Sequence, residues 1–192
     1  MKKLFLALAA VILGASMAHA QMQIDLMGAY TGAGDAKSQL GFGGGLGMTV
    51  VPNVNVMFHI IDGQYTKNAD EYNEVAYEHL MIQGAVEYGY RFAAPLVWAS
   101  SVALGWSKTG IEYNYSAPLA DKESLDDSGF SWAVYTGLQW IATQHITPFL
   151  QLGYHMSMYT GGLKDGSIAG VQILVGVRFT VFGSNKGIMD EY

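Results

Sequence analysis

The segment "VQILVGVRFTV", residues 171–181, alternates strictly between two kinds of side chain. The odd-numbered positions carry only Val, Ile and Phe, whereas the even-numbered positions are Gln172, Leu174, Gly176, Arg178 and Thr180. A period of two residues is that of a β-strand whose faces meet different surroundings. The segment therefore predicts a strand with one apolar face and one mixed face.

The same period recurs along the chain, and the helical period does not. It predicts eight strands, over residues 22–30, 40–50, 54–61, 77–92, 97–106, 130–141, 147–158 and 170–182. The connections alternate between short ones (51–53, 93–95, 142–145) and long ones (31–39, 62–76, 107–129, 159–169). Short turns at one end and long loops at the other are typical of transmembrane β-barrels.

Composition indicates which face points outward. Hydrophobic residues make up 51% of the chain, charged residues only 14%, and cysteine is absent. A soluble β-sandwich would turn its apolar faces inward, but so little charge cannot cover a water-facing surface. We therefore expect the apolar rows to face lipid and the mixed rows to face inward. The predicted fold is all-β, an eight-stranded antiparallel up-and-down transmembrane β-barrel; a soluble lipocalin-like carrier is the alternative.

The ends of the chain predict export. Two lysines, an apolar run from Leu4 and the sequence Ala18-His19-Ala20 form the pattern of a cleaved signal peptide. We expect residues 1–20 to be this peptide, residues 21–182 the barrel, and residues 183–192 a periplasmic tail. The location predicted is the outer membrane of a diderm bacterium.

The segment "LGFGGGLGMTV", residues 40–50, places glycine at inward positions 41, 43, 45 and 47. An eight-stranded barrel is only just wide enough for its own side chains. We expect these glycines to make room for large inward neighbours such as Met57, Tyr135 or Phe149.

Four tryptophans fall on the outward rows of two neighbouring strands, at Trp98, Trp106, Trp132 and Trp140. Each strand carries two, eight residues apart, a spacing close to the height of the apolar band of a membrane barrel. Indole rings favour the membrane interfaces. Because both cross-strand pairs are centred on residue 119, we expect Trp98 to face Trp140 and Trp106 to face Trp132.

These patterns resemble the small eight-stranded outer-membrane barrels, of the OmpA membrane-domain, OmpX and OmpW types. The ending from Gly176 to Phe182 is similar to the signal read by the barrel-assembly machinery, although Leu174 replaces the usual polar residue. The resemblance implies a barrel that meets this machinery during insertion and outer-membrane lipids thereafter. An OmpW type would imply a path for small or hydrophobic solutes.

Four charged residues share the inward rows near the short-turn end: Asp25, Glu87, Arg91 and Arg178. Because the first and last strands adjoin in a closed barrel, Asp25 and Arg178 are expected to meet. An unpaired charge in a narrow lumen is costly, so we predict an ion-pair network. It serves either as a structural plug or as the gate of a narrow conduit.

Three histidines, His59, His79 and His155, are also expected in the lumen. His59 and His79 are centred on residue 69, within the predicted loop 62–76, so they are expected to face each other. Imidazole is a common metal ligand, but no inward carboxylate or cysteine accompanies these residues. We therefore expect hydrogen-bonded histidines, and neither a metal site nor a cofactor.

The remaining functional surface is the long loops 62–76 and 107–129, which are acidic and rich in tyrosine. Three alternatives remain for these loops: they bind a cation, they bind an unknown partner, or they contact solvent alone. Acidic residues outnumber basic ones by 16 to 10, which argues against nucleic-acid binding. Ser100 has no histidine beside it on the lipid-facing rows, so no enzyme is expected. The sequence predicts a monomeric, structural envelope barrel; a narrow channel or solute transporter is the alternative.

Overall fold

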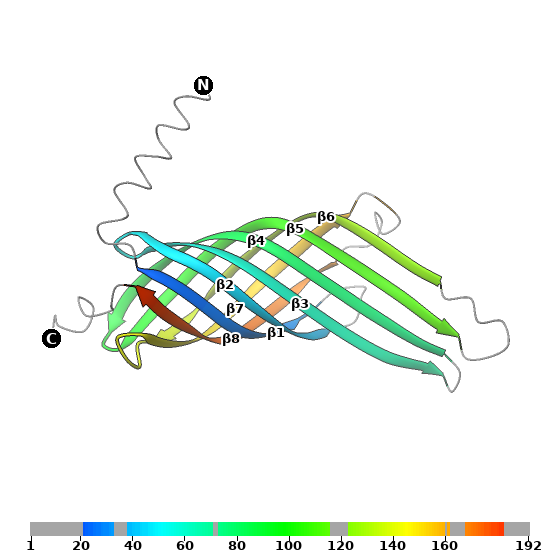
Figure 1. Ribbon diagram of the computed structural model, residues 1–192, viewed down its shortest axis with the longest axis horizontal. Coiled ribbons are helices and arrows are strands. Elements are labelled where there is room, and N and C mark those ends of the chain that lie inside the picture. Colours follow the sequence, from blue (N-terminus) through cyan, green and yellow to red (C-terminus); the bar gives the residue numbers. More distant parts are fainter. Residues whose placement is uncertain are drawn as a thin grey trace, which may run out of the picture.

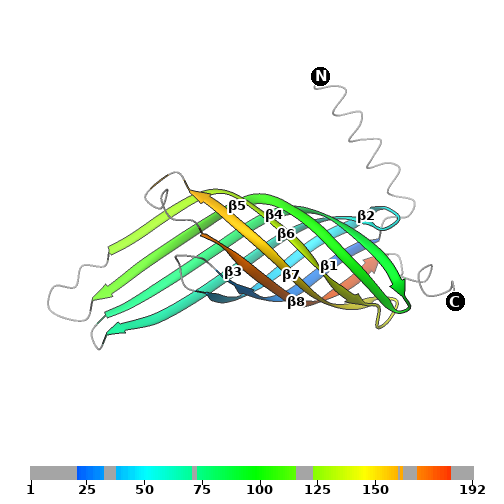
Figure 2. The same ribbon diagram turned by 180° about the vertical axis from the view of Figure 1, so that it is seen from behind.

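The computed structural model describes residues 21–32, 38–70, 73–115, 123–159, 161 and 168–182. They form one closed sheet in which every strand is antiparallel to its neighbours (Figures 1 and 2). The strands are β1 (Met22–Thr31), β2 (Gln39–Val51), β3 (Val54–Asp70), β4 (Asn73–Ala93), β5 (Leu96–Tyr115), β6 (Glu123–Trp140), β7 (Ile146–Tyr159) and β8 (Ile168–Phe182). The predicted eight-stranded up-and-down barrel is confirmed.

Each strand pairs with the next strand of the chain, and β1 closes the barrel against β8. The three short connections, at 52–53, 94–95 and 141–145, lie at one end, which we call the turn end. The connection between β2 and β3 holds Asn53 at a φ of 68°, a left-handed conformation that asparagine tolerates well. The opposite end is called the hairpin end.

The outer and inner faces differ as the alternation predicts. On β8, Val171 and Val175 expose 49% and 56% of their surface, whereas Gln172 and Leu174 between them are fully buried. On β4, Val86 and Tyr88 are exposed and Glu87 is buried. Polar and apolar side chains together fill the interior, and the outer wall presents hydrocarbon. The barrel is therefore the reverse of a water-soluble one.

The central strands are longer than the sequence indicates. Residues 62–70 and 73–76 were expected in a loop but continue β3 and β4, and residues 107–115 and 123–129 continue β5 and β6. These four strands therefore run well past the others at the hairpin end (Figure 1). The prediction was wrong because both faces of these extensions carry polar residues, so the apolar outward row by which a strand is recognised is interrupted there.

Two expectations concern residues outside the described part of the chain, the signal peptide over 1–20 and the tail over 183–192. Among the described residues, none belongs to a helix long and apolar enough to cross a membrane.

Candidate functional site inside the barrel

Two clusters of inward-facing polar residues lie near the two ends of the barrel. The turn-end cluster comprises Asp25, Asn55, His59, Glu87, Gln151 and Arg178. The hairpin-end cluster comprises Gln39, His79, Thr109, His155, Ser157 and Tyr159. Between them lies an apolar layer that includes Met27, Met57, Ile61, Met81, Tyr135, Phe149 and Leu174, of which Met57 and Phe149 reach into the turn-end cluster, next to His59 and Gln151 along their strands. Along β4 the inward row runs from Glu87 through Ala85, Gln83 and Met81 to His79, and Gln83 donates to Ser131 over 3.2 Å within this layer.

Arg178 is the centre of the turn-end cluster. The closure of β1 against β8 places Asp25 directly opposite it, as expected. Its Nε and Nη2 atoms donate to the two oxygens of Asp25 over 2.8 and 2.9 Å. Its Nη1 and Nη2 atoms donate to Glu87 over 2.6 and 3.3 Å. One guanidinium therefore joins β8 to β1 at its side and to β4 across the lumen.

The second acid, Glu87, has further partners. Asn55 donates to its Oε1 and Gln151 to its Oε2, each over 3.0 Å. Phe149 covers the guanidinium, with its ring centroid 5.8 Å from Arg178 Cζ. The charges are thus buried, paired and hydrogen-bonded, which is the condition under which an ion pair persists away from water. Gln151 and Asn55 were missed by the sequence analysis, although both lie on inward rows.

His59 and Arg91 occupy the edges of this cluster. His59 Nε2 lies 3.6 Å from Asp25 Oδ2. Arg91 follows Glu87 by four residues on β4, closer to the turn end, and is partly exposed. The expected contact between His59 and His79 is wrong, because His59 lies opposite Gln83 and His79 lies opposite Gly63. The hairpin is centred two residues later than assumed, on residue 71, because its strands extend into the predicted loop.

The hairpin-end cluster is built around His79 and His155, from strands on opposite sides of the barrel. His79 Nδ1 lies 2.7 Å from Thr109 Oγ1, and Thr109 Oγ1 lies 2.6 Å from the Tyr159 hydroxyl. His155 Nε2 lies 2.9 Å from the carbonyl oxygen of Gly32. The two imidazole rings approach with their centroids 5.7 Å apart. Of the three lumen histidines, His59 therefore belongs to the turn-end cluster, and His79 and His155 belong to the hairpin-end cluster.

The apolar layer is packed through glycines. An added Cβ at Gly47 would overlap Met57 Sδ, and one at Gly45 would overlap the ring of His59. Met57 is thus a neighbour of the β2 glycines, as expected. The expected contacts of Tyr135 and Phe149 with this row are wrong, because Tyr135 lies against Gly153 and Phe149 against Gly176. At these glycines the space is filled by a residue of the adjacent strand, whereas an added Cβ at Gly41 would meet the backbone of Asp62.

The four tryptophans lie on the outward rows of β5 and β6, but their pairing differs from the expectation. Trp98 lies opposite Leu138 and Trp106 opposite Phe130, while Trp140 pairs with Leu96 and Trp132 with Leu104. The hairpin is centred on residue 118 rather than 119. The shift moves each tryptophan by two residues, which keeps it on the outer face but makes the indole pairs diagonal.

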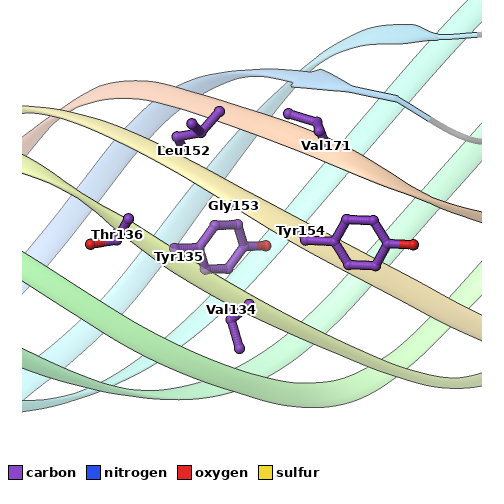
Figure 3. A pocket seen from close by; sticks show the side chains of 7 residues that line it. All are labelled: Val134, Tyr135, Thr136, Leu152, Gly153, Tyr154 and Val171. Carbon is purple, nitrogen blue, oxygen red and sulfur yellow. The ribbon is translucent and has the colours of Figure 1, made fainter.

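A shallow hollow of about 340 Å³ lies on the outer wall. Figure 3 shows the side chains that line it on β6, β7 and β8, among them Thr136, Leu152, Tyr154 and Val171. Thr136 Oγ1 also lies 3.0 Å from Ser100 Oγ, so this hydroxyl pair is exposed on an otherwise apolar surface. The hollow opens to the outside of the barrel and does not belong to either lumen cluster.

Within the described residues, no three side chains of the His, Cys, Asp and Glu types gather in a group able to hold a metal ion. The inward carboxylates of Asp25 and Glu87 are occupied by Arg178. The two histidines of the hairpin-end cluster are the pair of imidazoles whose rings approach each other.

Comparison with known proteins supports the architecture. No protein-family model matches the chain, and no curated protein matches it by sequence. Similar solved structures include Neisserial surface protein A (NspA), with a TM-score of 0.60, 12% identity, and coverage of 84% of this chain and 96% of that one. The attachment invasion locus protein Ail of Yersinia pestis has a TM-score of 0.57 and 12% identity over 83% of this chain and 97% of that one.

A major outer membrane protein from Thermus thermophilus is also similar, with a TM-score of 0.55 and 8% identity over 82% of this chain and 98% of that one. At such low identities the likeness concerns the fold. The resemblance to small eight-stranded outer-membrane barrels is thereby confirmed.

Proposed function

We propose that this chain is a non-enzymatic, monomeric barrel of the outer membrane of a diderm bacterium, with a lumen closed by side chains and a role in envelope integrity. One observation carries the proposal: the outer wall exposes hydrocarbon while the charges are buried inside. Leu26, Phe42 and Leu104 expose 59%, 82% and 55% of their surface, whereas Arg178 exposes 4%. In water this arrangement would be unstable, and in a bilayer it is the favourable one.

The exposed tryptophans support a membrane position for the wall. Trp98 and Trp106 lie eight residues apart on β5, which corresponds to about 26 Å along a strand at about 3.3 Å per residue. With the usual tilt, this spacing is close to the apolar band of about 25 Å. The turn end would then face the periplasm, and the long hairpins would face outward. Residues 1–20 would direct export, and the barrel-assembly machinery would insert the chain.

The lumen supports a structural role over conduction. Arg178 bridges the lumen from β8 to Glu87 on β4, and the apolar layer follows immediately. The alternative, a narrow channel or an OmpW-like path for hydrophobic solutes, would require an open bore or a continuous apolar trough. Polar clusters on both sides of the apolar layer interrupt such a trough in the part of the lumen that the structure describes.

The outward hairpins supply the surface for an interaction. Their exposed side chains include Asp62, Glu78, Glu112 and Asp126, and Lys108 pairs with Asp126 over 3.1 Å. Part of the acidic character predicted for the long loops therefore belongs to the outer faces of the extended strands. The partner of this surface is unknown.

Membrane residence is tested by fractionation of the native host and by quenching. The mature chain, refolded into vesicles containing brominated lipids, should lose tryptophan fluorescence, because Trp98, Trp106 and Trp140 face the bilayer. The folded band should also shift on heating before electrophoresis. Recovery of the chain with soluble periplasmic proteins, together with unquenched fluorescence, would exclude the proposal.

Closure of the lumen is tested by planar-bilayer conductance. We expect no stable current from the native barrel, and a small one from Glu87→Ala, which frees Arg178 on one side. A robust current from the native chain that changes in Glu87→Ala would replace the structural role with that of a channel.

A further inference from the structure

Each of the two histidines in the hairpin-end cluster has one ring nitrogen without a protein partner among the described residues. For His155 the tautomer follows from the structure. The carbonyl oxygen of Gly32 can only accept, so His155 Nε2 must donate the hydrogen bond of 2.9 Å. In the neutral ring, Nδ1 then carries a lone pair. This Nδ1 is buried and has no hydrogen-bond partner in the part of the chain that the structure describes.

His79 is held at its other nitrogen, by a hydroxyl that is able to accept the N–H of Nδ1. Its Nδ1 is held by Thr109 Oγ1 at 2.7 Å, and Tyr159 binds the same hydroxyl. Its Nε2 is buried without a partner in the described part of the lumen. A histidine that ligates a metal characteristically donates its other ring N–H to a neighbouring oxygen, which fixes the tautomer and the ring orientation. Both histidines have such a neighbour in place.

The distance between the rings fits one shared ion. A nitrogen–metal bond of about 2 Å places the ion about 3.2 Å from the ring centroid. Two imidazoles on one ion therefore have centroids at most about 6.4 Å apart, and those of His79 and His155 are 5.7 Å apart. This separation corresponds to a bent arrangement with room for a third donor. The side chains of Gln39 and Ser157 supply oxygens in the same cluster that have no partner within the described ranges.

The charge of the surroundings selects the kind of ion. The two nitrogens are neutral donors, and Asp127, whose Cα pairs with that of Thr109, places one carboxylate on the hairpin side. Its Oδ2 accepts from the amide of Gly161 over 2.9 Å. A divalent ion would remain largely uncompensated in such a low-dielectric site. A monovalent ion suits it better, and Met81, two residues from His79 on the same inward row, adds a soft thioether nearby.

We propose that His79 and His155 form a lumen site for a soft monovalent metal ion, of the Cu(I) and Ag(I) class. Thr109 and the Gly32 carbonyl act as positioning groups that hold the two rings. A purely structural barrel does not require histidine at positions 79 and 155. The proposed site also does not depend on whether the barrel lies in a membrane.

The test uses the full mature barrel refolded in detergent, titrated anaerobically with Ag(I) and with Cu(I) against a competing chromophoric chelator. We expect one tight equivalent per chain. His79→Gln and His155→Gln should each weaken it by at least about tenfold. His59→Gln is the matched control, because this lumen histidine lies in the turn-end cluster, and binding should be retained. Thr109→Val should weaken binding by about tenfold or more through the loss of ring positioning.

Absence of a tight equivalent, or binding that is equal in all three histidine variants, would overturn the site. Tighter binding of Zn(II) than of Ag(I) would overturn the assignment to a monovalent ion. X-ray absorption of the wild-type complex provides a readout that needs no variant to fold. It should show two imidazole ligands, and a shell of sulfur alone, from methionines elsewhere, would refute the proposal.

Discussion

The two polar clusters of the lumen solve the problem of burial differently. In the turn-end cluster three residues are charged, and all four oxygens of Asp25 and Glu87 accept hydrogen bonds. Only the ring nitrogens of His59 have no hydrogen-bond partner in this cluster among the described residues. In the hairpin-end cluster the histidines are held by neutral partners, Thr109 and the carbonyl oxygen of Gly32. Five of its buried side-chain atoms, from Gln39, His79, His155 and Ser157, have no partner among the described residues.

This difference indicates which cluster makes the barrel rigid and which cluster can bind a ligand. In the turn-end cluster the guanidinium and the carboxylates are matched with one another, so their pairing is costly to disturb and leaves no carboxylate oxygen free for a ligand. A cluster whose histidines are oriented but incompletely partnered can accept one. The apolar layer between them, with Met27 and Leu174, keeps the two apart. The turn-end cluster is thus expected to stabilise the barrel, and the hairpin-end cluster to bind.

The largest effect is expected from Arg178→Ala. It leaves Asp25 and Glu87 buried without their cation, a loss that costs about 3–5 kcal/mol when one partner of a buried pair is removed. The urea midpoint of the barrel in phospholipid vesicles, followed by heat-modifiable gel mobility, should fall accordingly.

The control for Arg178→Ala is the triple variant Asp25→Asn, Glu87→Gln, Arg178→Met, which removes all three charges together. It should recover most of the lost stability, because no charge remains unpaired. If Arg178→Ala unfolds at the wild-type urea concentration, the turn-end cluster is not what stabilises the barrel.

A smaller loss is expected in the apolar layer from Gly47→Ala. The added methyl overlaps Met57 Sδ, and overpacking of this kind costs about 1–3 kcal/mol. Met57→Ala in the same chain should recover part of the loss. Gly44→Ala is the matched control on the outward row, where the nearest atom to an added Cβ is the backbone oxygen of Asp25 at 3.4 Å. Equal urea midpoints for Gly47→Ala and Gly44→Ala would contradict the packing described.

In the hairpin-end cluster, Tyr159→Phe should cost about 1 kcal/mol, the typical net value of a neutral hydrogen bond. The substitution removes the hydroxyl that lies 2.6 Å from Thr109 Oγ1 and keeps the ring. The effect, measured from the same urea transitions, should be clearly smaller than that of Arg178→Ala. A loss as large as that of the charge variant would erase the contrast between the clusters.

The smallest effect is expected on the outer wall, from the double variant Ser100→Ala, Thr136→Val. It removes both partners of an exposed hydroxyl pair 3.0 Å apart and leaves no unmatched group, so stability should change by less than about 0.5 kcal/mol. Stability in vesicles and in detergent should be compared. A loss above about 1 kcal/mol in vesicles would show that the pair stabilises the wall.

Several features of the lumen were readable from residue order. The pairing of Asp25 with Arg178 follows from closure of the barrel, because the first and last strands must then be neighbours. The inward position of His59, His79 and His155 follows from the period of two. Which residues meet inside the barrel could not be read from residue order. His79 contacts Thr109 on the next strand and His155 across the lumen, and it does not face His59.

The reason lies in how register is set. A shift of one residue would turn every valine inward and is forbidden by burial, whereas a shift of two preserves every face. The alternation in the sequence therefore specifies parity but not the centre of a hairpin. The centres at residues 71 and 118 depend on strand extensions whose two faces are both polar.

By itself the sequence determined the strand count, the two faces of each strand and the inversion of polarity between wall and lumen, because these depend only on local alternation and composition. Which side chains meet inside was decided by the tertiary structure alone. Contacts across the lumen, such as Arg178 with Glu87 and His79 with His155, join residues far apart in the chain. Their alignment depends on the stagger of all eight strands when the sheet closes.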